Sequence, residues 1–139
     1  MKLIELDFYL NNTFLVGIFA ITAAVLAWSA EFSGLVYVCP YCRVQRTVIG
    51  ILGVIMLLPI RHHWLTKFGA AVIGFFGAVV AANQHFISWK KISSGTFSFK
   101  ENLAVDPFIL SGLAMIFILF LLLLMLQPAC ISTKSQLPN

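Results

Sequence analysis

Four long runs of apolar residues divide this chain and limit what it can fold into. The runs cover about residues 13–30, 43–60, 66–87 and 107–127. Each is near the roughly 20 residues that a helix needs to cross about 30 Å of hydrocarbon. Backbone N–H and C=O groups cannot stay unpaired in lipid, and the alternating pattern of a membrane β-barrel is absent. The sequence therefore predicts an all-α integral membrane protein, a bundle of four transmembrane helices.

The composition agrees with a lipid environment. Only 10% of the 139 residues are charged and 60% are hydrophobic, whereas a soluble domain carries about 25% charged residues. This length allows a single four-helix membrane domain, residues 1–139, with no room for a separate soluble module. The net charge of +4 sits in short connections between the runs. We therefore expect the lipid bilayer, and no nucleic acid, as a partner.

An even number of spans places both termini on one side of the membrane. The segments 31–42 and about 88–106 then lie on the other side. Arg43 and Arg46, which lie inside or beside the second run, are left out of the count of positive charges. On the terminal side the remaining basic residues are Lys2, Arg61, Lys67 and Lys134, and on the other side they are Lys90, Lys91 and Lys100. This excess of one positive charge predicts that both termini are cytoplasmic.

Small residues indicate where the helices pack closely. Gly50 and Gly53 lie in the second run, and a further set at helical spacing lies in the third, namely Ala70, Gly74, Gly77 and Ala81. Such residues let two membrane helices approach each other. The fourth run has little polarity, and we expect it to be the helix most exposed to lipid.

Two cysteines stand at the beginning of the second run, in the segment VCPYCRVQR at residues 38–46. Cys39 lies just before the predicted helix and Cys42 lies one turn inside it. Unpaired N–H groups and the helix dipole stabilise a thiolate at this position. Arg43 and Arg46 add positive charge. The pattern predicts a redox-active pair, with Cys39 and Cys42 as catalytic residues of thiol–disulfide exchange.

Other interpretations of the cysteine pair are less well supported by the residues. A disulfide that only ties the chain together would close a very small loop and would constrain little. A zinc site needs two further Cys or His ligands, yet His62 and His63 lie on the opposite side of the membrane, and the remaining histidine is His85 at the end of the third run. We therefore predict no metal site. A soluble glutaredoxin is excluded because no strand–CPYC–helix pattern exists.

Polar residues at the same depth suggest a cofactor site. Arg46 either extends to the lipid headgroups or faces the bundle interior, where it would stabilise an anion such as a reduced quinone oxygen. The third run ends in Asn83, Gln84 and His85. These side chains provide either ordinary interfacial polarity or hydrogen-bond donors to a quinone carbonyl. Arg46, Asn83 and His85 are accordingly the candidate cofactor-binding residues.

These residues resemble the disulfide bond formation protein B (DsbB) family. The family pattern, a Cys-x-x-Cys with an arginine four residues after the second cysteine, is present as Cys39, Cys42 and Arg46. A histidine at the outer end of the third helix matches His85, and a fourth helix opening with proline matches Pro107. The resemblance covers nearly the whole chain, and the CxxCxxxR motif carries most of it.

The resemblance implies a location and an activity. The location is the bacterial inner (cytoplasmic) membrane, with the Cys-x-x-Cys loop on the periplasmic side. The activity is that of a quinone-dependent protein thiol–disulfide oxidoreductase that serves disulfide bond formation. Its partner would be an extracytoplasmic thiol protein of the thioredoxin fold, similar to DsbA, and its cofactor would be ubiquinone or menaquinone. Electron flow in the reverse direction remains an alternative.

One departure from the family pattern opens a second hypothesis. Standard members carry another cysteine pair in the second periplasmic loop, but residues 88–106 contain no cysteine. The remaining cysteine, Cys130, follows the fourth run on the opposite side. Either the partner thiol attacks Cys39 directly, or the chain is a non-enzymatic, DsbB-like accessory subunit packed in a larger membrane complex.

Overall fold

The computed structural model describes residues 6–36, 38–98 and 106–127. Its helices are α1 (Leu6–Asn11), α2 (Thr13–Phe32), α3 (Pro40–Leu57), the short 3-10 helix η2 (Pro59–His62), α4 (Trp64–Ser93) and α5 (Pro107–Leu126). No strand occurs in the described residues, which confirms the all-α prediction for that part of the chain. Lys2, Lys100, Cys130 and Lys134 lie outside the described residues.

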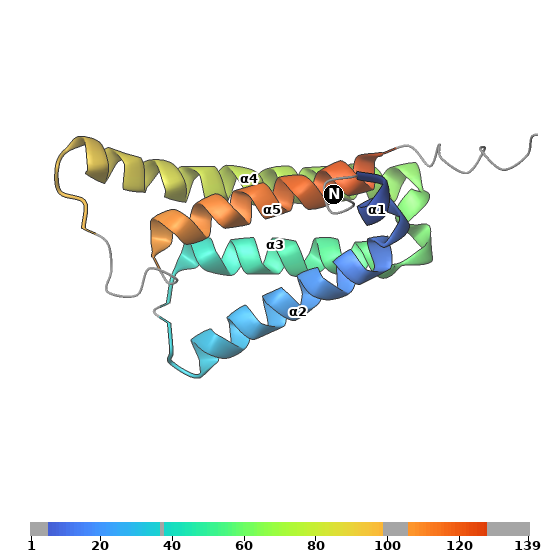
Figure 1. The fold of residues 1–139 in the computed structure, drawn as a ribbon, viewed down its shortest axis with the longest axis horizontal. Helices are drawn as coiled ribbons and strands as arrows, with labels where there is room; N and C mark the ends of the chain where they lie inside the picture. The colour runs from blue at the N-terminus through green and yellow to red at the C-terminus, as the bar shows by residue number, and fades with distance from the viewer. Residues whose placement is uncertain (1–5, 37, 99–105, 128–139) are drawn as a thin grey trace, which may run out of the picture.

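The long helices form two antiparallel pairs. α2 packs along α3, α4 packs along α5, and the contacts between α3 and α4 join the pairs. Figure 1 shows α3 between α2 and α4, with α2 diverging from α3 toward its own C-terminal end. The beginning of α2 and the end of α5 lie at the same end of the bundle, next to η2. There Lys67 Nζ donates a hydrogen bond to the backbone oxygen of Gln127, at 3.1 Å.

Three of the helices are long and apolar enough to cross a membrane. They are α2, α4 and α5, with mean hydropathies of 2.0, 1.8 and 3.0. The helix α3, which contains most of the predicted second span, is not among them. Its first two turns carry Arg43, Gln45 and Arg46, which lower its apolar character. The chain is therefore a multi-pass membrane protein by the composition of its helices.

Proline and capping residues determine where the helices begin and end. α3 ends at Leu57, three residues before the predicted boundary, because Pro59 disfavours helical geometry in the residue before it. Leu58 is accordingly extended, with φ −75° and ψ 141°. α5 begins at Pro107, where the Asp106 side chain accepts a hydrogen bond from the Phe108 N–H at 2.9 Å. This is the N-cap that the Asp-Pro sequence leads one to expect.

The core lies between the two helix pairs. It contains buried aliphatic side chains, the largest of them Leu52, Met56, Ile118 and Leu121. Gly77 of α4 allows this close packing, because a Cβ atom there would lie 2.6 Å from Cγ1 of Val48 in α3. In the same way a Cβ on Gly53 would lie 3.0 Å from the backbone oxygen of Gly17 in α2. The predicted contacts through small residues are therefore present.

The prediction that the fourth run is the most lipid-exposed helix is wrong. Of the three candidate spans, α5 has the largest buried share, 28%, while α2 has the smallest, 17%. Ile118, Leu121 and Leu124 of α5 are buried in the core. A uniformly apolar helix satisfies lipid and protein surroundings equally, so its hydropathy does not reveal which of them it faces.

Candidate functional site

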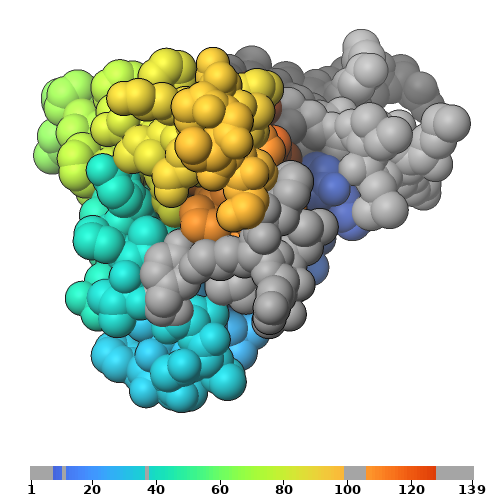
Figure 2. Space-filling view, turned by 90° about the vertical axis from the view of Figure 1, so that its left-hand side faces the viewer, coloured from blue at the N-terminus to red at the C-terminus, as the bar shows by residue number. Residues whose placement is uncertain are grey.

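The cysteine pair lies at the end of the bundle where α2 ends and α3 begins, the end that Figure 2 views. Cys39 is the N-cap residue of α3, and its Sγ accepts a hydrogen bond from the Cys42 N–H at 3.4 Å. Pro40 occupies the first position of the helix, where a missing N–H costs nothing. Both cysteines are free thiols, and both are buried, with exposed fractions of 7% and 8%.

Gln84 of α4 meets both sulfur atoms. Its Nε2 lies 3.5 Å from Sγ of Cys42 and 3.7 Å from Sγ of Cys39. The Oε1 atom of the same amide lies 3.9 Å from Sγ of Cys42 and accepts a hydrogen bond from Gln45 Nε2 at 2.8 Å. In the sequence, Gln84 belongs to the polar cluster Asn83, Gln84 and His85, but it is not among the predicted site residues. Its distinguishing signal is burial, which no sequence pattern displayed.

A buried carboxylate, Glu31, joins α2 to α3 beside the cysteines. Glu31 Oε1 accepts a hydrogen bond from Arg43 Nε at 2.6 Å, and Oε2 accepts one from Arg46 Nη1 at 2.6 Å. The exposed fraction of the Glu31 side chain is only 2%. The Arg46 guanidinium also lies over the Trp28 ring, 5.9 Å from its centroid. Arg46 therefore faces the α2–α3 interface instead of extending to headgroups.

The partner of Arg46 was missed in the sequence. Glu31 lies twelve residues before Arg43, beyond a turn that contains Gly34 with φ 72°. Helical spacing cannot connect residues across such a turn. The only available signal was that Glu31 is an acidic residue at the end of an otherwise uncharged apolar run.

The remaining cofactor candidates lie elsewhere in the bundle. The His85 ring stacks on Phe108 with centroids 4.3 Å apart, and its Nδ1 lies 3.1 Å from Phe108 O and 3.2 Å from Ser111 Oγ. These contacts belong to the α4–α5 interface. Asn83 is exposed on α4. The structure thus brings Gln84 to the cysteines, while Arg46 and His85 make their contacts to different helices.

A small cavity adjoins the sulfur site. It has a volume of about 240 Å³, and its lining includes Tyr41, Gln84, Ser88, Lys91 and Asp106. The lining residues come from the beginnings of α3 and α5, the end of α4 and the segment that follows α4. Gln84 belongs both to this cavity and to the sulfur contacts. The cavity therefore borders the cysteine pair through the Gln84 side chain.

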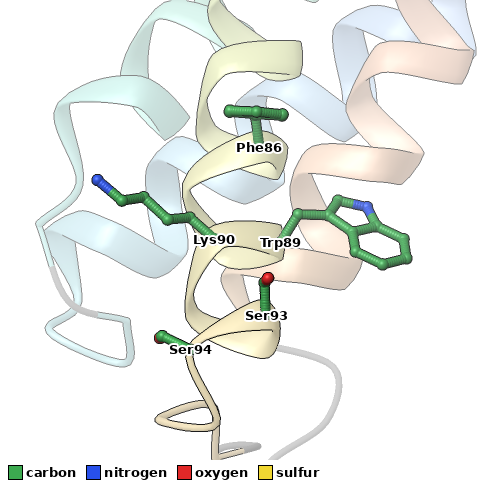
Figure 3. A pocket seen from close by; sticks show the side chains of 5 residues that line it. All are labelled: Phe86, Trp89, Lys90, Ser93 and Ser94. Atoms are coloured by element: carbon green, nitrogen blue, oxygen red, sulfur yellow. The ribbon is translucent and has the colours of Figure 1, made fainter.

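A second hollow lies on the outer face of the last turns of α4, away from the cysteines. Figure 3 shows the residues around it, which are Phe86, Trp89, Lys90, Ser93 and Ser94. Trp89 and Lys90 extend to opposite sides of the helix (Figure 3), and tryptophan at a helix end is typical of the boundary between lipid and water. α4 has 30 residues, about 45 Å of helix, which exceeds the roughly 30 Å of hydrocarbon.

The donor set near the cysteines can be compared with the needs of a quinone, which binds through its carbonyl oxygens. Arg46 follows Cys42 by one helical turn. Its guanidinium has five N–H donors, of which one donates to Glu31 Oε2. The Trp28 ring adds an aromatic surface beside it. His85 follows Gln84 directly. In kind, these residues are hydrogen-bond donors and an aromatic surface of the sort that a quinone needs, but Arg46 faces α2 and His85 faces α5.

No protein-family model, no curated protein and no solved structure matches this chain.

Proposed function

We propose that the chain is a membrane thiol oxidoreductase, in which Cys39 and Cys42 pass two electrons from an extracytoplasmic dithiol partner to a quinone. The observation that carries the proposal is the placement of both sulfurs. They lie at the N-terminal end of a helix, in a membrane-type bundle, against one buried amide. Two cysteines that only formed a structural disulfide would need no such polar contact from a second helix.

The proposed exchange uses the disulfide form of the pair. A thiolate of the partner attacks Cys39 Sγ, which forms a mixed disulfide and releases Cys42 as a thiolate. The partner's second thiolate then attacks the other partner sulfur, the one bonded to Cys39 Sγ in that mixed disulfide. This step releases Cys39 as a thiolate and the partner leaves oxidised, and Cys39 and Cys42 take up the two protons that the partner dithiol gave up. Cys39 takes the role of the attacked sulfur because it precedes α3 and follows the connecting segment.

Restoring the disulfide requires an acceptor for two electrons and two protons. A quinone supplies that oxidising capacity when bound. Arg46 and His85, with Asn83 as a further donor, are the residues proposed to hold it. The guanidinium of Arg46 is oriented by Glu31, and the imidazole of His85 is oriented by Phe108 and Ser111. Oriented donors lose little freedom when they bind a ligand.

The membrane arrangement belongs to the same proposal. α3 has 18 residues, about 27 Å of helix, which suits a fourth span beside the three apolar helices. Its polar first turns would lie at the periplasmic surface of a bacterial inner membrane. Half of the Arg43 side chain is exposed there, 46% by area. Both termini would then be cytoplasmic.

Thiol trapping in membranes tests the proposal. In a Cys130→Ser background, Cys39 and Cys42 are the only cysteines, so alkylation with a mass tag reports their state alone. We expect the pair to be oxidised when quinone is available and to become reduced when quinone is withdrawn. A Cys42→Ala variant should accumulate a mixed disulfide between Cys39 and the partner. A pair that stays reduced, or stays bridged, whatever the quinone supply would support the accessory-subunit hypothesis instead.

A further inference from the structure

Among the described residues of α4, only Gln84 has a side chain within hydrogen-bonding contact of the cysteine sulfurs. It is itself buried, with an exposed fraction of 5%. Burying an amide is costly unless it is hydrogen-bonded. Both ends of this amide are used, since Nε2 faces the two sulfurs and Oε1 faces Gln45.

Gln45 pairs with the oxygen of this amide in the orientation seen in the structure. Its Nε2 donates to Gln84 Oε1 at 2.8 Å, and its exposed fraction is 4%. Turning the Gln84 amide over would bring two NH₂ groups against each other, because an amide nitrogen is a donor only. The Nε2 group of Gln84 is therefore held toward the sulfurs by a residue one turn beyond Cys42.

We propose that Gln84 is a catalytic residue of the exchange, whose Nε2–H groups stabilise the Cys42 thiolate as it leaves the disulfide. The inference rests on the proposed thiol–disulfide function. In the step concerned, the bond between a partner sulfur and Cys39 Sγ forms while the Cys39–Cys42 bond breaks. The electron pair of the broken bond remains on Cys42 Sγ, which lies 3.5 Å from Gln84 Nε2.

A carboxamide suits this position because it serves both states of the sulfur. As a thiol, Cys42 donates weakly to Gln84 Oε1, 3.9 Å away; as a thiolate it accepts from Nε2. An apolar side chain would leave a buried anion without a donor from α4, and a carboxylate would repel it. The nearby charges, Arg43, Arg46 and Glu31, pair with each other.

The test measures the intrinsic reactivity of Cys42 and needs neither partner nor quinone. The parent protein carries Cys39→Ser and Cys130→Ser, so Cys42 is the only thiol. The rate of reaction with a small alkylating reagent is followed against pH in detergent. Gln84→Met removes the donor, and Gln84→Glu replaces it with an acid of the same shape. Ser93→Asp is the matched control, because it adds a negative charge to the outer face of the same helix (Figure 3).

We expect both Gln84 variants to move the pH dependence upward by about one unit, or to slow the reaction about tenfold at fixed pH, as one lost charge-assisted hydrogen bond predicts. Ser93→Asp should leave the profile unchanged. If both Gln84 variants kept the pH profile of the parent protein, the inference would be overturned. That result would not contradict quinone-dependent cycling of the Cys39–Cys42 pair, which thiol trapping tests separately.

A second measurement needs no substitution at Gln84. In protein labelled with ¹⁵N, the side-chain amide signals of Gln84 should shift when the Cys39–Cys42 pair is oxidised. The signals of Asn12, whose amide donates to the Phe8 backbone at the other end of the bundle, should not. Unchanged Gln84 signals would count against the inference even if the Gln84 variants failed to fold.

Discussion

The Glu31 carboxylate at the end of α2 forms an ion pair with the Arg46 guanidinium in α3, with Oε2 2.6 Å from Nη1. Arg43 binds the other carboxylate oxygen. One buried acid thus holds two arginines at the end of the α2–α3 pair where the cysteines lie. The orientation of Arg46 depends on a residue from another helix, and this dependence can be tested.

Glu31→Gln should loosen the end of α2 from α3. The substitution leaves Arg43 and Arg46 without their shared anion, so we expect a lower Tm in detergent. Arg46→Gln should also lower it, and the double variant should lose less than the two losses combined, because the two side chains interact directly. Ser29→Ala, at an exposed position two residues earlier, is the control. If the losses of Tm in the two single variants simply add up in the double variant, Glu31 and Arg46 do not stabilise the fold through their direct contact.

Arg46→Lys should not be a conservative change. Lysine keeps the charge but loses the planar group that pairs with Glu31 and lies over Trp28. A charge-assisted hydrogen bond contributes about 1.5–3 kcal/mol, so quinone-dependent reoxidation of Cys39–Cys42 should slow by roughly ten- to a hundredfold. Protein abundance in the membrane should hardly change. Normal reoxidation would make Arg46 an anchor, and the quinone site would have to lie elsewhere.

Gly77→Ala should destabilise the bundle while Gly69→Ala should not. Both glycines lie on α4, but a Cβ at position 77 would meet Val48 at 2.6 Å, whereas nothing lies within 4 Å of one at position 69. Overpacking costs about 1–3 kcal/mol, and alanine in an open helix position contributes about 0.5–1 kcal/mol of stability. Thermal unfolding in detergent compares the two variants. Equal effects would mean that α3 and α4 do not pack through Gly77.

Labelling of introduced cysteines checks the membrane arrangement. Ser94 follows α4 and His62 lies in η2, at opposite ends of the bundle, and both are exposed. In a background with Cys39→Ser, Cys42→Ser and Cys130→Ser, an impermeant reagent should label Ser94→Cys in intact cells and His62→Cys only after lysis. Equal labelling of both positions in intact cells would remove the four-span arrangement.

The sequence alone determined the helical class and the boundaries that local chemistry sets. Long uncharged runs predict helices because lipid leaves backbone groups no other partner, and Asp106 with Pro107 marked the start of α5 from two adjacent residues. The Cys39–Cys42 pair could likewise be recognised at the beginning of α3, since an N-terminal position depends only on neighbouring residues. Interactions of this kind join residues that are close together in the sequence, so the sequence alone can indicate them.

Only the tertiary structure decided which side chains meet. Gln84 reaches the sulfurs of Cys39 and Cys42 from 45 and 42 positions away along the chain, and Glu31 reaches Arg46 across a turn. It also decided that α5, the most apolar of the three candidate spans, is the best buried of them. A helix period describes one helix at a time, whereas these contacts depend on how two helices rotate against each other. That rotation is set by small residues such as Gly53 and Gly77, whose effect appears only when the facing helix is in place.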